Sequence, residues 1–166
     1  MRGPYLNPAD ATEKRTTMSR TLLLIDDGVN FAPLIERITQ ELLPELRVSN
    51  AKTGKEGLQK ARAEAPDLIL LDIKLPDING YEVCRKLRAD PRTRHVPILM
   101  ISGVARSEGD VMKGRQAGAD DYMFKPFVPA ELIARIRALL SEHRTPPPLQ
   151  PVPWFKKMFH LKPRQP

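Results

Sequence analysis

The sequence lacks two features that would place it outside the cell or in a membrane. It has a single cysteine, Cys84, so it cannot form an intramolecular disulfide bond. It has no long apolar run, because no segment approaches the roughly 20 consecutive apolar residues of a transmembrane helix. The run over residues 22–25 is too short for the core of a signal peptide, and acidic residues follow it directly. We therefore expect a cytoplasmic protein without a transmembrane segment.

The middle of the sequence also lacks an excess of charge of one sign. The whole chain has a formal net charge of +7, which by itself suggests a nucleic-acid partner. Residues 1–20 carry +2 of this charge and residues 141–166 carry +4, which leaves +1 for residues 21–140. The basic character therefore belongs to the two ends, and the body of the protein is near neutral.

The 166 residues are enough for one domain with tails, and 41% hydrophobic residues are enough for a packed core. Residues 1–18 have no periodic apolar pattern, so we expect a disordered extension, with Met18 as a candidate start of translation. We expect the domain over residues 19–144. Residues 145–166 begin with a stiff proline-rich spacer, PPPLQPVP, and continue into a basic amphipathic tail, WFKKMFHLK.

The segment DLILLDIKLPDING, residues 67–80, organises the domain. Its apolar run from Leu68 to Leu71 is typical of a central strand that is covered on both faces of a parallel sheet. The strand ends at Asp72, and a turn marked by Asn79 and Gly80 leads into a helix. Ligands of open parallel sheets bind beyond the carboxyl ends of the strands, which is where Asp72 would lie.

Short apolar runs alternate with helical patterns along the whole domain. We expect strands over residues 21–25, 46–50, 67–71, 97–101 and 121–124, and helices over residues 29–43, 54–65, 81–89, 108–117 and 130–142. The first helix would present one apolar face, made of Leu34, Ile35, Ile38 and Leu42. The last helix would direct a similar set inward: Leu132, Ile133, Ile136, Leu139 and Leu140. Such alternation predicts an α/β fold, a doubly wound parallel sheet with right-handed crossovers.

Polar residues stand at the carboxyl ends of four of these strands. Asp26 and Asp27 follow the first, Asp72 the third, Ser102 the fourth and Lys125 the fifth. Three neighbouring carboxylates would repel one another, so the site requires a hard divalent cation, and magnesium (Mg²⁺) suits carboxylate, water and phosphate oxygens. With the metal bound, Asp72 can attack phosphorus and form an acyl phosphate, while the metal and Lys125 neutralise charge.

Four segments, LLLIDD, LILLDIKLPDINGYEVCRKLR, PILMISG and AGADDYMFKPF, resemble the response-regulator receiver domain of two-component signalling. The resemblance covers about residues 20–142. It implies a five-stranded flavodoxin-like sheet of order 2-1-3-4-5 flanked by five helices, with Asp72 as the phosphoacceptor. It also implies that Asp27 and Asp72 hold Mg²⁺ directly, Asp26 through water, and Lys74 through its backbone carbonyl.

The same resemblance assigns roles to the later strand ends. Ser102 would hydrogen-bond the phosphoryl group, Lys125 would pair with it, and Tyr122 would be the switch aromatic. The peptide bond between Lys125 and Pro126 would be cis, although only about 5% of X–Pro bonds are cis.

These assignments predict a signalling phosphoacceptor, which is not an enzyme except toward its own phosphorylation and dephosphorylation. A histidine kinase or phosphotransfer protein would supply the phosphoryl group. A changed face, made of the fourth helix, fifth strand and fifth helix, would then be read by a downstream protein. Only 22 residues follow Arg144, too few for a helix-turn-helix module, so we expect a stand-alone receiver without direct DNA binding. Lys74 and Val104 occupy positions that influence phosphoryl loss, which leaves the phosphorylated lifetime open.

Two alternatives stay open. The chain could be an adaptor that binds nucleic acid or a membrane surface through its basic tail, where Trp154, Phe155, Met158, Phe159 and Leu161 have helical spacing among Lys156, Lys157 and Lys162. Nucleic-acid binding would weaken steeply as salt rises, so a salt titration tests that alternative. The second alternative is a degenerate receiver that is not phosphorylated.

Overall fold

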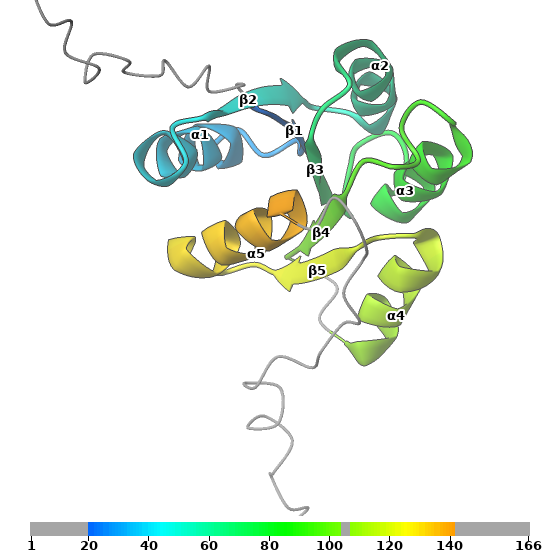
Figure 1. Cartoon of the computed structure of the whole chain (residues 1–166). Helices are drawn as coiled ribbons and strands as arrows, with labels where there is room; N and C mark the ends of the chain where they lie inside the picture. The colour runs from blue at the N-terminus through cyan, green and yellow to red at the C-terminus, as the bar shows by residue number, and fades with distance from the viewer. Residues whose placement is uncertain (1–19, 104–106, 142–166) are drawn as a thin grey trace, which may run out of the picture.

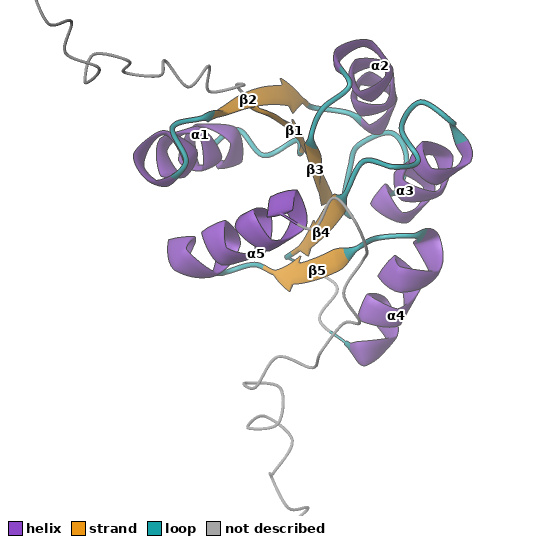
Figure 2. Cartoon of the chain, in the orientation of Figure 1, coloured by secondary structure: helices purple, strands orange, loops and turns teal. Residues whose placement is uncertain are grey.

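A computed structural model describes residues 20–103 and 107–141, in which five strands alternate with five helices (Figures 1 and 2). The strands are β1 (Arg20–Ile25), β2 (Leu46–Ala51), β3 (Leu68–Asp72), β4 (Ile98–Ser102) and β5 (Asp121–Phe124). The helices are α1 (Phe31–Leu42), α2 (Gly54–Glu64), α3 (Gly80–Ala89), α4 (Glu108–Ala117) and α5 (Pro129–Ser141). The predicted N-terminal extension, the proline-rich spacer, the basic tail and Val104 lie outside the described residues.

The five strands form one parallel sheet in the order β2-β1-β3-β4-β5, as predicted. Helices α1 and α5 cover one face, and α2, α3 and α4 cover the other (Figure 1). The crossovers therefore place helices on both faces, which confirms the predicted doubly wound α/β fold. Within the described residues, no helix is long and apolar enough to cross a membrane.

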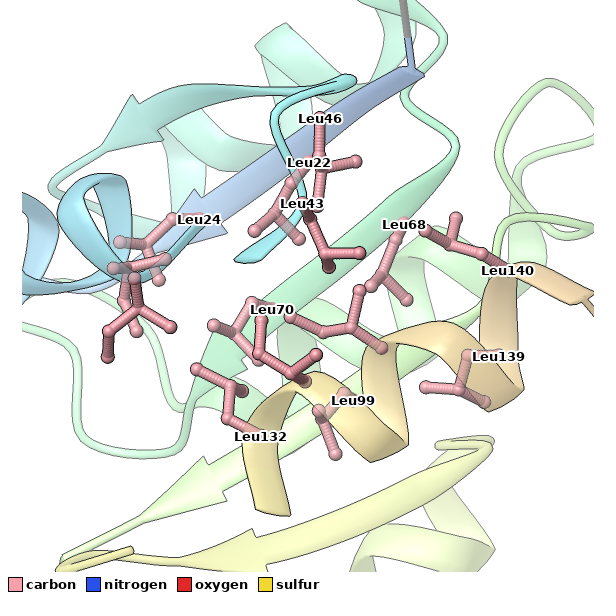
Figure 3. Close-up of a cluster of buried hydrophobic side chains, with 14 of the residues drawn as sticks. Leu22, Leu24, Leu43, Leu46, Leu68, Leu70, Leu99, Leu132, Leu139 and Leu140 are labelled. Carbon is pink, nitrogen blue, oxygen red and sulfur yellow. The ribbon is translucent and has the colours of Figure 1, made fainter. Parts of the chain in front are cut away.

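Strand β3 lies at the centre of the sheet, and all five of its residues are buried. Leu68 and Leu70 pack into the core under α1 and α5, where Figure 3 shows them among leucines of β1, β4 and α5. Ile69 and Leu71 pack into the second core, under α2, α3 and α4. Burial of each such side chain stabilises the fold by about 1.5–3 kcal/mol. The continuous apolar run therefore reflects a strand covered on both faces, and it holds Asp72 rigidly at its end.

The buried face of α1 differs from the prediction. Ile35 and Ile38 are buried as expected, but Leu34 and Leu42 are 36% and 42% exposed. The third buried position is Thr39, whose hydroxyl donates to the backbone carbonyl of Ile35 at 2.9 Å and so needs no water. The apolar face is therefore centred on Ile35, Ile38 and Thr39, with Leu34 at its edge and Leu42 at the end of the helix.

The boundaries of all ten elements agree with the prediction to within two residues. The largest difference is at α1, which begins at Phe31 instead of Val29. The single cysteine, Cys84, is buried in α3, and burial raises the pKa of its thiol to about 11. In α5 the five residues predicted to point inward are all buried: Leu132, Ile133, Ile136, Leu139 and Leu140.

The chain after β3 turns back against the end of its own strand. Asn79 caps α3 by accepting a hydrogen bond from the Tyr81 amide at 2.8 Å, and the Gly80 amide donates to the Ile73 carbonyl at 2.9 Å. A Cβ at Gly80 would overlap the carbonyl oxygen of Asp72 and lie 2.7 Å from the Cα of Ile73. Only glycine therefore allows α3 to begin directly against the backbone of Asp72.

The loop between β3 and α3 is also attached to α2. The two carboxylate oxygens of Asp77 accept hydrogen bonds from the amides of Gly54 and Lys55, at 2.8 and 2.9 Å. These amides belong to the first turn of α2, where backbone N–H groups lack partners within the helix. Asp77 thus satisfies two of these groups and fixes the loop that begins at Asp72.

Candidate functional site

Four strands, β1, β3, β4 and β5, run parallel in a register that brings their carboxyl ends together. This end of the sheet is called the carboxyl edge below. This edge carries every polar residue predicted for the site, each at a strand end or just after it: Asp26, Asp27, Asp72, Ser102 and Lys125. The side chains differ in their burial, because Asp26, Asp72 and Ser102 are buried and Asp27 is exposed. The polar side chains at this end of the sheet are therefore partly enclosed by the protein, and Asp27 faces solvent.

Lys125 joins two of the predicted acids. Its Nζ donates to Oδ2 of Asp26 and to Oδ2 of Asp72, both at 2.6 Å. Such short charge-assisted bonds are roughly twice as strong as neutral ones. The cation is therefore held at a defined place between a β1 acid and the β3 acid.

The electrostatics of Asp26 reflect this crowding. Burial raises the pKa of Asp26 above its ordinary value, and the neighbouring Asp72 carboxylate raises it further. Lys125 and the amide of Gly28, which donates to Oδ1 at 2.7 Å, act in the opposite direction without cancelling the effect. Two carboxylates share one ammonium, so the pair retains a negative charge that a further cation would offset.

Asp72 is held through both of its carboxylate oxygens. Oδ1 accepts a hydrogen bond from the backbone amide of Lys74 at 2.9 Å, and Oδ2 accepts the bond from Lys125. The Ile73 amide continues the ladder to the Ile101 carbonyl at 3.2 Å. The Asp72 carboxylate therefore has a fixed orientation at the carboxyl end of β3, beside the backbone of Lys74.

The predicted metal ligands are gathered only in part. Across residues 20–103 and 107–141, no three acidic, histidine or cysteine side chains form a group that could hold a metal ion. Asp26 and Asp72 lie together at Lys125, whereas Asp27 is exposed. Mg²⁺ usually keeps several waters and takes one or two carboxylates plus phosphate oxygens, so two acids with surplus negative charge fit its chemistry. The sequence predicts that Asp26, Asp27, Asp72 and the Lys74 carbonyl hold it, and of these Asp26 and Asp72 share the Lys125 ammonium.

A series of hydroxyl groups leads away from Ser102. The hydroxyls of Ser102 and Tyr81 lie near enough to that of Tyr122 to act on its pKa, which burial raises well above its ordinary value. The Tyr81 hydroxyl donates to the backbone carbonyl of Asp110 in α4, at 3.3 Å. The Tyr122 ring lies close to Gly114, where a Cβ would come within 2.9 Å of it. The predicted switch residue is thus buried between the strand edge and α4.

Sequence reasoning missed three aromatic residues of this region. Tyr81 extends the hydroxyl series to α4. The ring of Phe31 lies under the Lys125 ammonium, with Nζ 3.8 Å from the ring centroid, and Phe127 meets Phe31 edge-on at 6.0 Å. Tyr81 and Phe127 lie within the segments that carry the family resemblance, but only the folded loops bring Phe31 to Lys125. The Lys125–Pro126 peptide bond is cis, which confirms the prediction.

Comparison with known proteins gives a consistent result. Residues 22–137 match the family model described as the response regulator receiver domain. The chain is 39% identical over 123 residues to response regulator PleD from Caulobacter vibrioides, a match that covers 74% of this chain and 26% of PleD. It is 42% identical over 132 residues to the DNA-binding response regulator MtrA from Mycobacterium tuberculosis, covering 79% of this chain and 55% of MtrA. The chain thus spans about a quarter and about half of these two relatives.

A solved structure matches the fold over nearly its whole length. It is the receiver domain of sensor histidine kinase PA1611 from Pseudomonas aeruginosa PAO1, which holds a magnesium ion coordinated in its active-site cleft. The TM-score is 0.67 at 32% sequence identity, and the match covers 74% of this chain and 98% of that one. The similarity thus extends to a domain with a metal at its active site.

Proposed function

Because the chain belongs to the response-regulator receiver family, we propose that Asp72 accepts a phosphoryl group from a histidine kinase or a phosphotransfer protein. The observation that carries this proposal is the Asp72 carboxylate itself, fixed at the end of the central strand by Lys125 and the Lys74 amide. A degenerate receiver would lack part of this set. The alternative based on the basic tail falls on residues outside those described.

The chemistry requires one bond to form and one to break. A carboxylate oxygen of Asp72 attacks phosphorus, the bond from phosphorus to the donor breaks, and its electron pair stays on the donor atom. Lys125 places positive charge beside Asp72 and offsets the charge that the phosphoryl oxygens bring. Bound Mg²⁺ would supply further charge neutralisation for these oxygens. The Ser102 hydroxyl, at the neighbouring strand end, is the candidate donor to one of them.

A phosphodonor protein needs a surface to dock against, and apolar side chains flank the site. Val29 follows β1 and is 81% exposed, and Val128 follows β5 and is 61% exposed. The edge-on contact between Phe31, at the start of α1, and Phe127, in the loop after β5, joins these two segments. We propose that the donor covers this apolar rim and excludes water from Asp72 during transfer.

Phosphorylation is expected to require Mg²⁺. Wild-type protein incubated with a small phosphodonor such as acetyl phosphate and Mg²⁺ should gain the mass of one phosphoryl group, because the metal offsets the repulsion between phosphoryl oxygens and the acids. The same mixture with a chelator should gain none. Equal uptake in both mixtures would contradict the role of the metal, and absence of uptake in both would contradict the phosphoacceptor.

The output would pass through the hydroxyl series. A phosphoryl group on Asp72 would draw the Ser102 hydroxyl toward its oxygens and away from Tyr122, which changes the contacts of Tyr122 with Tyr81 and α4. Two arrangements of Tyr122 would exchange, and phosphate would shift their populations by its different contacts in each. The face of α4, β5 and α5 would then be read by a downstream protein.

A Ser102→Ala variant tests this link. With the phosphoryl mimic beryllofluoride, wild-type amide NMR shifts should extend from Asp72 to α4, β5 and α5. In Ser102→Ala they should stay near Asp72, because the hydroxyl that couples phosphate to Tyr122 is gone. Ser141→Ala, which removes an exposed hydroxyl of α5, should respond like wild type. Shifts in wild type that never reach α4 would contradict the switch.

A further inference from the structure

We propose that Phe31 is a positioning residue for phosphorylation, whose ring face holds the Lys125 ammonium beside Asp26 and Asp72. The inference rests on the proposed function of Asp72, and it assigns a task to a residue outside the polar set. The Nζ of Lys125 lies 3.8 Å from the centroid of the Phe31 ring, well inside the roughly 6 Å of a cation–π contact. The ring thus contacts the same ammonium that donates to both carboxylates.

The position of the ring is itself fixed. Phe31 is the first residue of α1, and it is partly buried against the core under α1 and α5. Phe127, from the loop after β5, packs against it with a centroid distance of 6.0 Å and an interplanar angle of 81°. Edge-to-face pairs of this kind are favourable beyond the area they bury. The Lys125 ammonium therefore contacts a ring that the core holds on one side and Phe127, from the loop that follows Lys125, holds on another.

The flexibility of the lysine side chain explains why a contact with the Phe31 ring would help to position Lys125. Lysine has a flexible four-carbon stem and a compact charge, and it loses rotamer entropy when it is fixed. The negative face of an aromatic ring attracts it from a further direction, by an amount that corresponds to a roughly 2- to 30-fold preference for the held position. The positive charge of Lys125, which pairs with the phosphoryl oxygens, is then in place before the transfer.

The first measurement observes the contact directly and needs no phosphorylation. Protons that lie over the face of an aromatic ring are shifted upfield, so the side-chain methylene protons of Lys125 next to Nζ should resonate upfield in wild type. Phe31→Tyr should retain the shift, because the ring face remains. Phe31→Leu, which keeps an apolar side chain, should lose it. An unshifted Lys125 signal in wild type would overturn the inference.

The second measurement separates positioning from packing. Fluorine atoms on a phenylalanine ring weaken its negative face with little change in size, so fluorinated phenylalanines incorporated at position 31 should slow phosphorylation by acetyl phosphate and Mg²⁺ progressively. We expect a loss of roughly 5-fold for Phe31→Leu and for the most fluorinated ring, within the range of a cation–π contact.

The outcomes distinguish the two proposals. A rate that is constant through the fluorine series at position 31, in a wild type that accepts phosphate, would overturn the role of Phe31 and leave Asp72 as the phosphoacceptor. A wild type that accepts no phosphate would overturn the proposed function, while the Lys125 proton shifts would still report whether ring and ammonium are in contact. A rate that falls with fluorination, together with upfield Lys125 protons, supports the inference.

Discussion

Replacing Gly80 by alanine is expected to lower the free energy of unfolding by about 3 kcal/mol, at the upper end of typical overpacking costs. The added methyl group would overlap the Asp72 carbonyl oxygen and lie 2.7 Å from the Ile73 Cα. Both contacts are with backbone atoms of a central strand, which cannot turn aside as a flexible side chain can. Chemical denaturation followed by circular dichroism measures the loss. Because the clash is at Asp72, phosphorylation should slow as well.

Gly109→Ala provides the matched control. Gly109 lies in the exposed first turn of α4, and a Cβ there would have only the Ser107 Oγ at 3.5 Å, an ordinary contact. Alanine should stabilise this helix by about 0.5–1 kcal/mol, because it restricts the unfolded chain and favours the helix. Equal stability of Gly80→Ala and wild type would contradict the close approach of α3 to β3.

The fold could be predicted because its strands are short apolar runs separated by helical patterns. The run from Leu68 to Leu71 required cover on both faces, and the structure provides two cores on the two sides of it. Polar residues directly after strands could be assigned to one edge because parallel strands end together. The sheet order itself came from the family resemblance, since the pattern of apolar runs alone is equally compatible with other orders.

The parts that could not be predicted depend on loop paths and on competition between groups. Three carboxylates and an amine were predicted at one end of the sheet, but not the pairing in which Lys125 binds both Asp26 and Asp72. The contact of Phe31 with Lys125 joins residues 94 positions apart through two loops, which no local pattern encodes. In α1 the burial of Thr39 in place of the leucines depends on a hydroxyl bond inside the helix.

Asp72→Asn is expected to abolish phosphate uptake, reducing it to the background level. An asparagine amide is a far weaker nucleophile than a carboxylate and cannot form the acyl phosphate. The substitution keeps an oxygen that can accept the hydrogen bond from the Lys74 amide, so the loop after β3 should keep its path. It also leaves Lys125 paired with Asp26, so the fold should be retained.

Asp67→Asn is the matched control, because Asp67 directly precedes the same strand at the opposite edge of the sheet. There its carboxylate accepts a hydrogen bond from the Thr21 amide at 2.7 Å, which an asparagine oxygen can also accept. The two variants therefore remove the same charge from the two ends of β3, and only one of them removes the proposed nucleophile.

The most direct test of the phosphoacceptor is the intact mass of three proteins after incubation with acetyl phosphate and Mg²⁺. Wild type and Asp67→Asn should each gain the mass of one phosphoryl group, and Asp72→Asn should gain none. Phosphate uptake by Asp72→Asn equal to that of wild type would contradict the assignment of Asp72.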